Sequence, residues 1–241
     1  MHQLQFKLFG EKAILIEWFP EISMSVLNGI LDFQSKIATN NYPFLETIIG
    51  YNSLTILYSQ KIVNYENEVE ILKNIYKSDF QIPNKSNYFW EIPVCYDAEF
   101  GLDLKEISIK NNLSIDKIVT IHSETIYTVF FIGFLPGFLY LAGLNPQLFM
   151  DRKPNPRLKI DKGSVGIGGK QTGIYPLNSP GGWNIIGKTP LLFFDSENEI
   201  PCFATTKDQI KFIPINIKEF YEIQESVANR SYHMIKKQSN D

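Results

Sequence analysis

The sequence is poor in the residues that mark several common classes of protein. Its 241 residues include two cysteines, three histidines and three arginines. Cys95 and Cys202 lie far apart and form no Cys-x-x-Cys pair, so we expect neither a disulfide framework nor a metal site. A reducing cytoplasm is the simplest location for such a chain.

Basic clusters and targeting segments are also lacking. The net charge is −3, and no interleaving of basic and aromatic residues suggests nucleic-acid binding. The N-terminus has no basic region followed by an apolar core, so no signal peptide is expected. Residues 125–150 are uncharged and match the ~20 residues that a membrane helix needs, but Gly133, Pro136, Gly137 and Gly143 interrupt them. We expect no nucleic-acid partner and no membrane span.

Glycine, by contrast, is concentrated in one segment. Residues 163–190 hold eight of the fifteen glycines, with three prolines, two lysines and no acidic residue. Glycines let backbone N–H groups approach a ligand closely. Residues 125–194 carry a net charge of +5, against −8 for the rest of the chain. The pattern predicts a pocket for an anion or polar small molecule, with solvated surface lysines as the alternative.

The first third of the chain alternates strand-like and helix-like segments. We expect strands at 4–8, 13–18, 45–50 and 54–58, and helices at 22–39 and 65–76. This ββαββα order indicates an α+β layer. The polar segment 81–88 is typical of a linker, so we expect one domain over 1–85 and a second over 86–241.

The second domain begins with mixed elements and continues as β structure. We expect strands at 88–95 and 125–132, helices at 103–111 and 114–122 capped by Asp103 and Ser114, and an amphipathic C-terminal helix at 217–228. Between residues 132 and 214, short apolar runs alternate with Gly and Pro turns. Such alternation favours a β-barrel or a compact β domain.

A literal P-loop string, GWNIIGKT, occupies residues 182–189. A true P-loop lies between a strand and a helix, whereas Pro190 and an apolar, strand-like run follow this string. We therefore interpret the match as coincidental. Lys188 stays a candidate for contacting a phosphate.

Three residues are candidates for catalysis. His122 ends a predicted helix and could transfer protons near neutral pH, with a structural histidine as the alternative. Arg157, in a chain that otherwise prefers lysine, offers a planar fork for a carboxylate or phosphate, although a surface ion pair would also explain it. Lys188 would share that anion-binding role.

Polar and aromatic groups in the glycine-rich segment are candidates for binding an amide-containing substrate by hydrogen bonds and an aromatic wall. They are Gln171, Tyr175, Ser179 and Trp183, together with the backbone at Gly168 and Gly169. Turn chemistry alone would also place polar residues here.

Several strings resemble the KipI/PxpB family, also called allophanate hydrolase subunit 1. They are EIPVCY at 91–96, IHS at 121–123, FIGFLPGFLYL at 131–141, GSVGI at 163–167, QTGIYP at 171–176 and SPGGW at 179–183. The chain departs from the usual family pattern at 160–163, where Val-Pro-Ala-Gly is common, at Gly168, where Ala is usual, and at Lys188, where Arg is usual.

The resemblance implies an α+β protein with a small ferredoxin-like-type N-terminal domain and a cyclophilin-like β-barrel. It implies the B subunit of a bacterial ATP-dependent 5-oxoprolinase, which opens 5-oxo-L-proline to L-glutamate. The implied partners are the C subunit, of the KipA type (allophanate hydrolase subunit 2), and the A subunit, of the LamB/YcsF type. ATP would bind with or through a partner, with Mg²⁺ as its counter-ion, and this chain would be inactive alone. A KipI-type inhibitor of a sensor histidine kinase, or a component of a urea or allophanate amidohydrolase system, is the alternative.

Overall fold

The structure, a computed structural model, describes residues 4–79 and 87–238. The chain divides into two compact units, Met1–Lys85 and Ser86–Asp241. The predicted linker at 81–88 lies outside the described residues except for its last two positions. None of the helices in the described ranges has the length and apolar character that a bilayer crossing requires.

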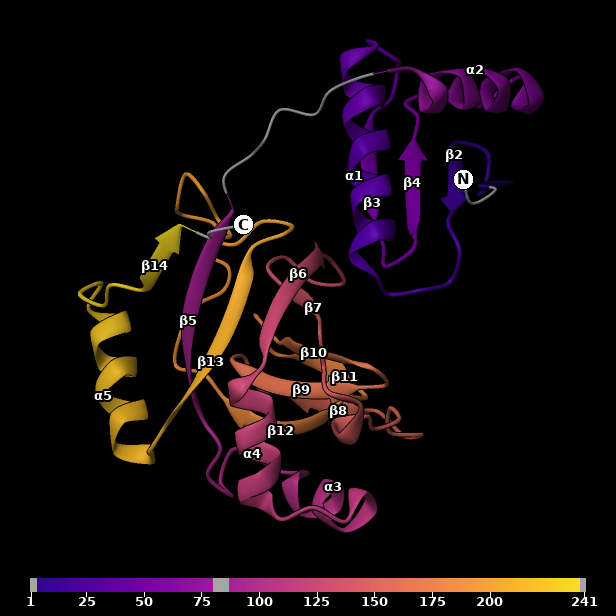
Figure 1. Cartoon of the computed structure of the whole chain (residues 1–241). Coiled ribbons are helices and arrows are strands. Elements are labelled where there is room, and N and C mark those ends of the chain that lie inside the picture. Colours follow the sequence, from indigo (N-terminus) through magenta and orange to yellow (C-terminus); the bar gives the residue numbers. More distant parts are fainter. Residues whose placement is uncertain (1–3, 80–86, 239–241) are drawn as a thin grey trace. The chain divides into compact units, whose positions relative to one another are not determined.

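The N-terminal unit is a four-stranded antiparallel sheet with two helices (Figure 1). Its elements are β1 (Gln5–Leu8), β2 (Ala13–Glu17), α1 (Met24–Thr39), β3 (Glu46–Ile49), β4 (Ser53–Leu57) and α2 (Tyr65–Lys77). Alternate residues of β2 and β4, such as Ile14, Ile16, Leu54 and Ile56, are buried. They pack with Phe33 and other apolar residues of the helices, so the sheet has one buried face.

The predicted ββαββα order is confirmed, but the ferredoxin-like description is not. A ferredoxin-like unit runs βαββαβ, whereas this unit consists of two hairpins that are each followed by a helix. The hairpins meet through β2 and β4, giving the sheet order β1-β2-β4-β3. The short turns after β1 and β3 allow only antiparallel neighbours, because a parallel pair needs a longer crossover.

The second unit is built on a closed seven-stranded β-barrel, which confirms the barrel prediction (Figure 1). Around the barrel the strand order is β12-β9-β10-β7-β6-β13-β5, and Lys188 of β12 pairs with Cys95 of β5 to close it. The strands are β5 (Tyr88–Cys95), β6 (Ile126–Ile132), β7 (Leu139–Ala142), β9 (Ser164–Gly168), β10 (Gln171–Ile174), β12 (Asn184–Lys188) and β13 (Gln209–Ile215).

The remaining elements surround this barrel. They are α3 (Leu104–Asn111), α4 (Ile115–Glu124), a 3-10 turn η1 (Pro146–Leu148), a separate two-stranded ribbon of β8 (Arg157–Ile160) and β11 (Ser179–Gly181), α5 (Ile217–Ala228) and β14 (Ile235–Gln238). In Figure 1, α5 runs alongside β5 on the outside of the barrel, in agreement with the contacts between them. The uncharged segment 125–150 forms β6, a turn, β7 and η1, as its glycines and proline predicted.

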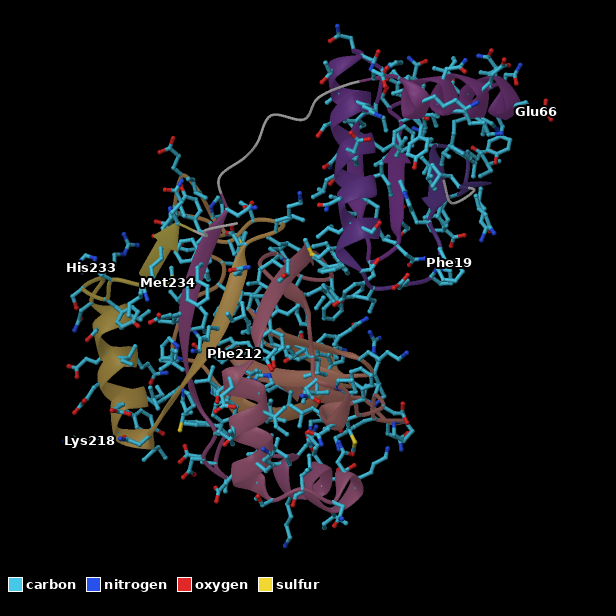
Figure 2. All side chains as sticks on the ribbon, in the orientation of Figure 1. Phe19, Glu66, Phe212, Lys218, His233 and Met234 are labelled. Atoms are coloured by element: carbon cyan, nitrogen blue, oxygen red, sulfur yellow. The ribbon has the colours of Figure 1, made fainter. Side chains whose placement is uncertain are left out.

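The barrel interior is filled by apolar side chains from every part of the wall. Val94, Val129, Leu141, Ile167 and Phe212 are among its fully buried members. Phe212, labelled in Figure 2, belongs to β13. The centre is therefore a packed core, and a ligand pocket must lie elsewhere on this unit.

Candidate functional site

A cavity of about 340 Å³ opens beside the β8–β11 ribbon of the barrel unit. It is lined by five aromatic residues (Phe134, Phe138, Tyr140, Tyr175, Trp183), the backbone of Gly181 and Gly182, two prolines (Pro156, Pro180) and Arg152. We call this cavity the aromatic pocket. Its volume lies in the range of small-molecule sites, about 300 to 1,000 Å³, and its glycines come from the end of β11 and the turn that follows.

The aromatic walls hold one another in place. Phe138 is the hub, with its ring edge-on to Tyr175 at 5.1 Å and to Trp183 at 5.4 Å between centroids. Tyr140 is 4.8 Å from the same ring. Phe138, Tyr175 and Trp183 are nearly fully buried and form a small core of their own with Ile160 and Ile185. Such edge-to-face packing is favourable and keeps the pocket shape rigid.

The turn before β7 carries backbone strain at the pocket. Phe134 has φ of 68°, a conformation that is rare for a bulky residue, and 64% of it is exposed. Gly137, at φ of 81°, has no room for a Cβ because the carbonyl oxygen of Phe193 would lie 2.6 Å away. Strained backbone of this kind is concentrated at binding sites. The turn predicted at this segment is present and presents Phe134 at the pocket.

Among the described residues, Arg152 is the one charged residue in the lining of the aromatic pocket. Its guanidinium carbon lies 5.8 Å from the Trp183 ring centroid, a distance at which a cation is attracted to the ring face. No ion pair within the described ranges involves Arg152. Arg152 lies in the basic segment 125–194, but the sequence pattern favours Arg157 as the anion-binding candidate. The rarity of arginine was the available signal, and it did not discriminate between the two.

Arg157 instead forms an internal ion pair. Both of its terminal nitrogens donate to the carboxylate of Asp103, at 2.9 and 2.7 Å. The same carboxylate accepts from the backbone N–H of Ile185 at 2.6 Å and from Lys153 at 2.9 Å. The geometry favours the ion-pair alternative for Arg157, because its planar fork already binds the carboxylate at the start of α3. An anion-binding role for Arg157 stays a prediction.

Asp103 is the centre of that cluster, with 3% of its side chain exposed. Burial by itself raises its pKa, but the hydrogen bonds from Arg157, Ile185 and Lys153 outweigh burial, so the pKa is lowered. Asp103 does occupy the predicted N-cap position of α3, yet its side chain makes no capping bond. The cluster ties α3 to β8 and β12.

His122 lies inside the barrel unit and is fully buried. Its ring stacks on Phe212 at 4.7 Å, Nδ1 is 2.8 Å from the Tyr96 hydroxyl, and Nε2 is 3.0 Å from the Thr172 hydroxyl. Because Thr172 donates its hydrogen to the carbonyl of Gly166, it accepts from Nε2–H, and Nδ1 accepts from Tyr96. Burial lowers the pKa of His122 to about 3. The geometry favours the structural alternative over proton transfer.

Lys188 lies apart from the aromatic pocket, although Gly182 and Trp183, the first two residues of the P-loop string, line it. Residues 184–188 of the string form β12, a barrel strand, which confirms that the match is coincidental. The Lys188 ammonium is 3.6 Å from Asp161 and 5.5 Å from the Phe100 ring centroid. It lines a different cavity with Lys162, beside α5. A phosphate-binding role for Lys188 stays a prediction.

The six predicted substrate-binding residues are only partly brought together. Tyr175 and Trp183 line the aromatic pocket. The carbonyl oxygen of the Gln171 side chain is buried without a hydrogen-bond partner. The Ser179 hydroxyl donates to the Pro180 carbonyl at 3.2 Å, and Gly169, at φ of 67°, pairs with Met150. Their roles in binding stay predictions.

Gly168 has a packing role behind the pocket wall. A Cβ at this position would lie 2.5 Å from Nε1 and 2.6 Å from Cδ1 of the Trp183 indole. The indole therefore lies directly over the glycine backbone. Glycine in place of the alanine that is usual in the family therefore leaves room for the Trp183 indole.

Gly168→Ala is expected to displace the indole and to destabilise the protein by about 1 to 3 kcal/mol, as overpacking of a filled site does. The measurement is denaturant unfolding together with the tryptophan emission spectrum, to which Trp183 contributes. Gly133→Ala is the control, because its nearest neighbour would be 3.7 Å away. Equal stability of the two variants would show that the indole moves without cost.

No group of three or more His, Cys, Asp or Glu side chains suited to a metal ion occurs in the part of the chain that the structure describes.

The chain is similar to known proteins over most of its length. The family model "Carboxyltransferase domain, subdomain C and D" matches residues 4–204. The B subunit of 5-oxoprolinase from Bacillus subtilis (strain 168) is 35% identical over 236 residues, covering 92% of this chain and 97% of that protein.

Solved structures agree with this match. A conserved uncharacterized protein from Pyrococcus horikoshii is 37% identical with a TM-score of 0.54, covering 90% of this chain and 100% of that one. The urea amidolyase of Kluyveromyces lactis has a TM-score of 0.87 over 99% of this chain but 19% identity, which shows a shared fold. This chain spans 16% of the amidolyase, and 40% of another solved relative.

Proposed function

The chain belongs to the family of carboxyltransferase subdomains C and D, and we propose that it is the B subunit of an ATP-dependent 5-oxoprolinase. The observation that carries the proposal is the match of nearly the whole chain to a 5-oxoprolinase B subunit, at 35% identity over 97% of that relative. The proposed reaction opens 5-oxo-L-proline to L-glutamate and consumes ATP.

The aromatic pocket supports this proposal on chemical grounds. The described residues of its lining combine apolar rings with one cation and include no carboxylate, which suits a small, flat, anionic ring compound. We propose that transfer of the ATP γ-phosphoryl group to the lactam carbonyl oxygen, with release of ADP, activates the ring, since an unactivated amide is a poor electrophile. Water then attacks the carbon, the ring C–N bond breaks and phosphate leaves, which gives L-glutamate.

The remaining components of the proposal concern the assembly. Two partners, the C subunit of the KipA type and the A subunit of the LamB/YcsF type, would complete the site. ATP would bind with or through one of them, with Mg²⁺ as its counter-ion. The use of the P-loop-like string as β12 supports a nucleotide site on a partner. A cyclophilin-like classification of the barrel, a cytoplasmic location and inactivity of the isolated chain are parts of the same proposal.

The test is reconstitution of the three subunits. ATP-dependent release of glutamate from 5-oxo-L-proline is expected from the complete mixture and from none of the mixtures that omit one component. Phosphate release should follow glutamate release in a fixed ratio. A complete, well-folded mixture without turnover, together with block of histidine-kinase autophosphorylation by this chain alone, would instead support the KipI-type alternative.

A further inference from the structure

We propose that the aromatic pocket is the site for the carboxylate-bearing lactam, with Arg152 binding the carboxylate and the Tyr175 hydroxyl donating to the ring carbonyl. The identity of the lactam rests on the proposed function. The pocket and its chemistry rest on the geometry of this chain.

The basic residues around the pocket differ in whether they are already paired. Three basic residues, Arg152, Lys153 and Arg157, lie close together in sequence. Lys153 and Arg157 both bind Asp103, and Lys153 also binds Glu106 at 2.7 Å. Arg152 alone of the three lines the aromatic pocket and takes part in no ion pair of the described residues. Lys153 and Arg157 are therefore paired with Asp103, and Arg152 is available to bind a ligand.

The Trp183 ring orients the side chain of Arg152. Its guanidinium lies at the Trp183 ring, which restricts a side chain that would otherwise move freely in solvent. Burial raises the pKa values of Tyr140 and Tyr175, and the charge of Arg152 opposes that rise at both hydroxyls. A guanidinium that is held beside an apolar wall is suited to bidentate binding of a carboxylate.

The Tyr175 hydroxyl is the proposed hydrogen-bond donor to the ligand. Burial raises the pKa of Tyr175 to about 12, so its hydroxyl is protonated at neutral pH. The backbone N–H of Trp183 hydrogen-bonds the Tyr175 oxygen, which leaves the hydroxyl hydrogen to donate to a ligand oxygen. The Phe138 and Trp183 rings then provide apolar walls for the methylene carbons of the lactam.

The same lining argues against other ligands. The described residues of the pocket offer no carboxylate to a cationic ligand. They offer one guanidinium to a triphosphate, which needs several cations and backbone donors. The chemistry therefore selects a compound with one negative charge and a small apolar ring.

The test compares Arg152→Met with Arg230→Met in the full chain. Arg230 is an arginine of the same unit that is paired with Glu197 at 2.9 Å, outside the pocket. Titration with 5-oxo-L-proline, followed by tryptophan fluorescence and calorimetry, is expected to show at least a tenfold weaker affinity for Arg152→Met and no change for Arg230→Met. Arg152→Lys should fall between wild type and Arg152→Met, because a lysine keeps charge but loses the fork.

A second ligand separates carboxylate recognition from general damage. 2-Pyrrolidinone has the lactam ring without the carboxylate, so its weak affinity should be the same in wild type and Arg152→Met. In the reconstituted enzyme, Arg152→Met should raise the KM for 5-oxo-L-proline at least tenfold with a smaller effect on kcat. An unchanged KM in an active enzyme would overturn the carboxylate role, as would equal loss of both ligands.

The two proposals fail in different ways. A complete mixture that is inactive, while the chain binds 5-oxo-L-proline in an Arg152-dependent manner, would refute the 5-oxoprolinase and leave the pocket. An active mixture whose KM ignores Arg152 would refute the pocket and leave the enzyme. If a folded preparation showed no activity and no binding, both proposals would be refuted.

Discussion

Asp103→Asn is expected to lower the free energy of unfolding by about 3 kcal/mol, which is the scale for breaking a buried ion pair by removing one partner. The carboxylate is buried and accepts from Arg157, Lys153 and the Ile185 N–H. Asparagine keeps the size and one acceptor oxygen but loses the charge that binds both cations. Denaturant unfolding at neutral pH measures the loss.

The effect of Asp103→Asn should depend on pH in a defined direction. The pKa of Asp103 is lowered in the folded protein relative to its ordinary value of 3.8. A carboxyl group of this kind stabilises the fold fully above its unfolded pKa, and the contribution is lost as the pH falls through the folded pKa. The difference between wild type and Asp103→Asn is therefore constant at neutral pH and shrinks below about pH 4.

Glu197→Gln is the matched control for Asp103→Asn. Its ion pair with Arg230 has a similar length of 2.9 Å, but both side chains are about three-quarters exposed. Exposed pairs contribute about 0 to 1 kcal/mol, so this variant should be nearly neutral. Equal losses in the two variants would contradict the view that burial makes the Asp103 cluster important.

His122→Ala is expected to destabilise the protein by about 3 to 5 kcal/mol, the range for emptying a ring-sized space in a packed core. The change removes the stacking on Phe212 and leaves the hydroxyls of Tyr96 and Thr172 without their partner. The measurement is thermal and denaturant unfolding. His233→Ala, at an exposed position, is the control and should change stability by less than about 0.5 kcal/mol.

His122 should also give the wild type an acid-sensitive stability. Its pKa falls from 6.5 to about 3 on folding, so the unfolded chain takes up a proton that the folded chain excludes. This contribution is complete above pH 6.5 and declines as the pH falls toward 3, by up to roughly 5 kcal/mol. His122→Gln should lack this decline. A reconstituted enzyme with His122→Gln that folds but loses the pH dependence of kcat would contradict the structural role and restore the proton-transfer hypothesis.

Local sequence signals predicted the elements well, because helix caps and apolar periodicity act over a few residues. Ser114 accepts from the Lys117 N–H as an N-cap, and one face of α1 carries Val26, Ile30, Phe33 and Ile37 into the core. The interruption of 125–150 by glycine and proline was enough to identify strands and turns. The ββαββα order also followed from pattern. Its ferredoxin-like classification is not confirmed, because a ferredoxin-like unit runs βαββαβ.

The candidate site could be predicted only in part. Tyr175 and Trp183 were found because they belong to the glycine-rich segment, and both line the aromatic pocket. Phe134 and Phe138 come from a turn before β7, and Arg152 follows η1, so no spacing in the sequence joins them to that segment. Their meeting depends on the barrel register that sets β10 between β7 and β9.

The sequence by itself determined the α+β character, the position of most strands and helices and the polar, basic nature of the central segment. Composition and periodicity carry this information because each residue contributes to it independently of distant partners. Only the tertiary structure decided which charged residues are available. Arg157 and Arg152 look alike in the sequence. In the structure, Arg157 binds the carboxylate of Asp103, 54 positions away, whereas Arg152 is oriented by the indole of Trp183. Charge neutralisation and burial depend on contacts between residues far apart in the chain, and these exist only in the folded barrel.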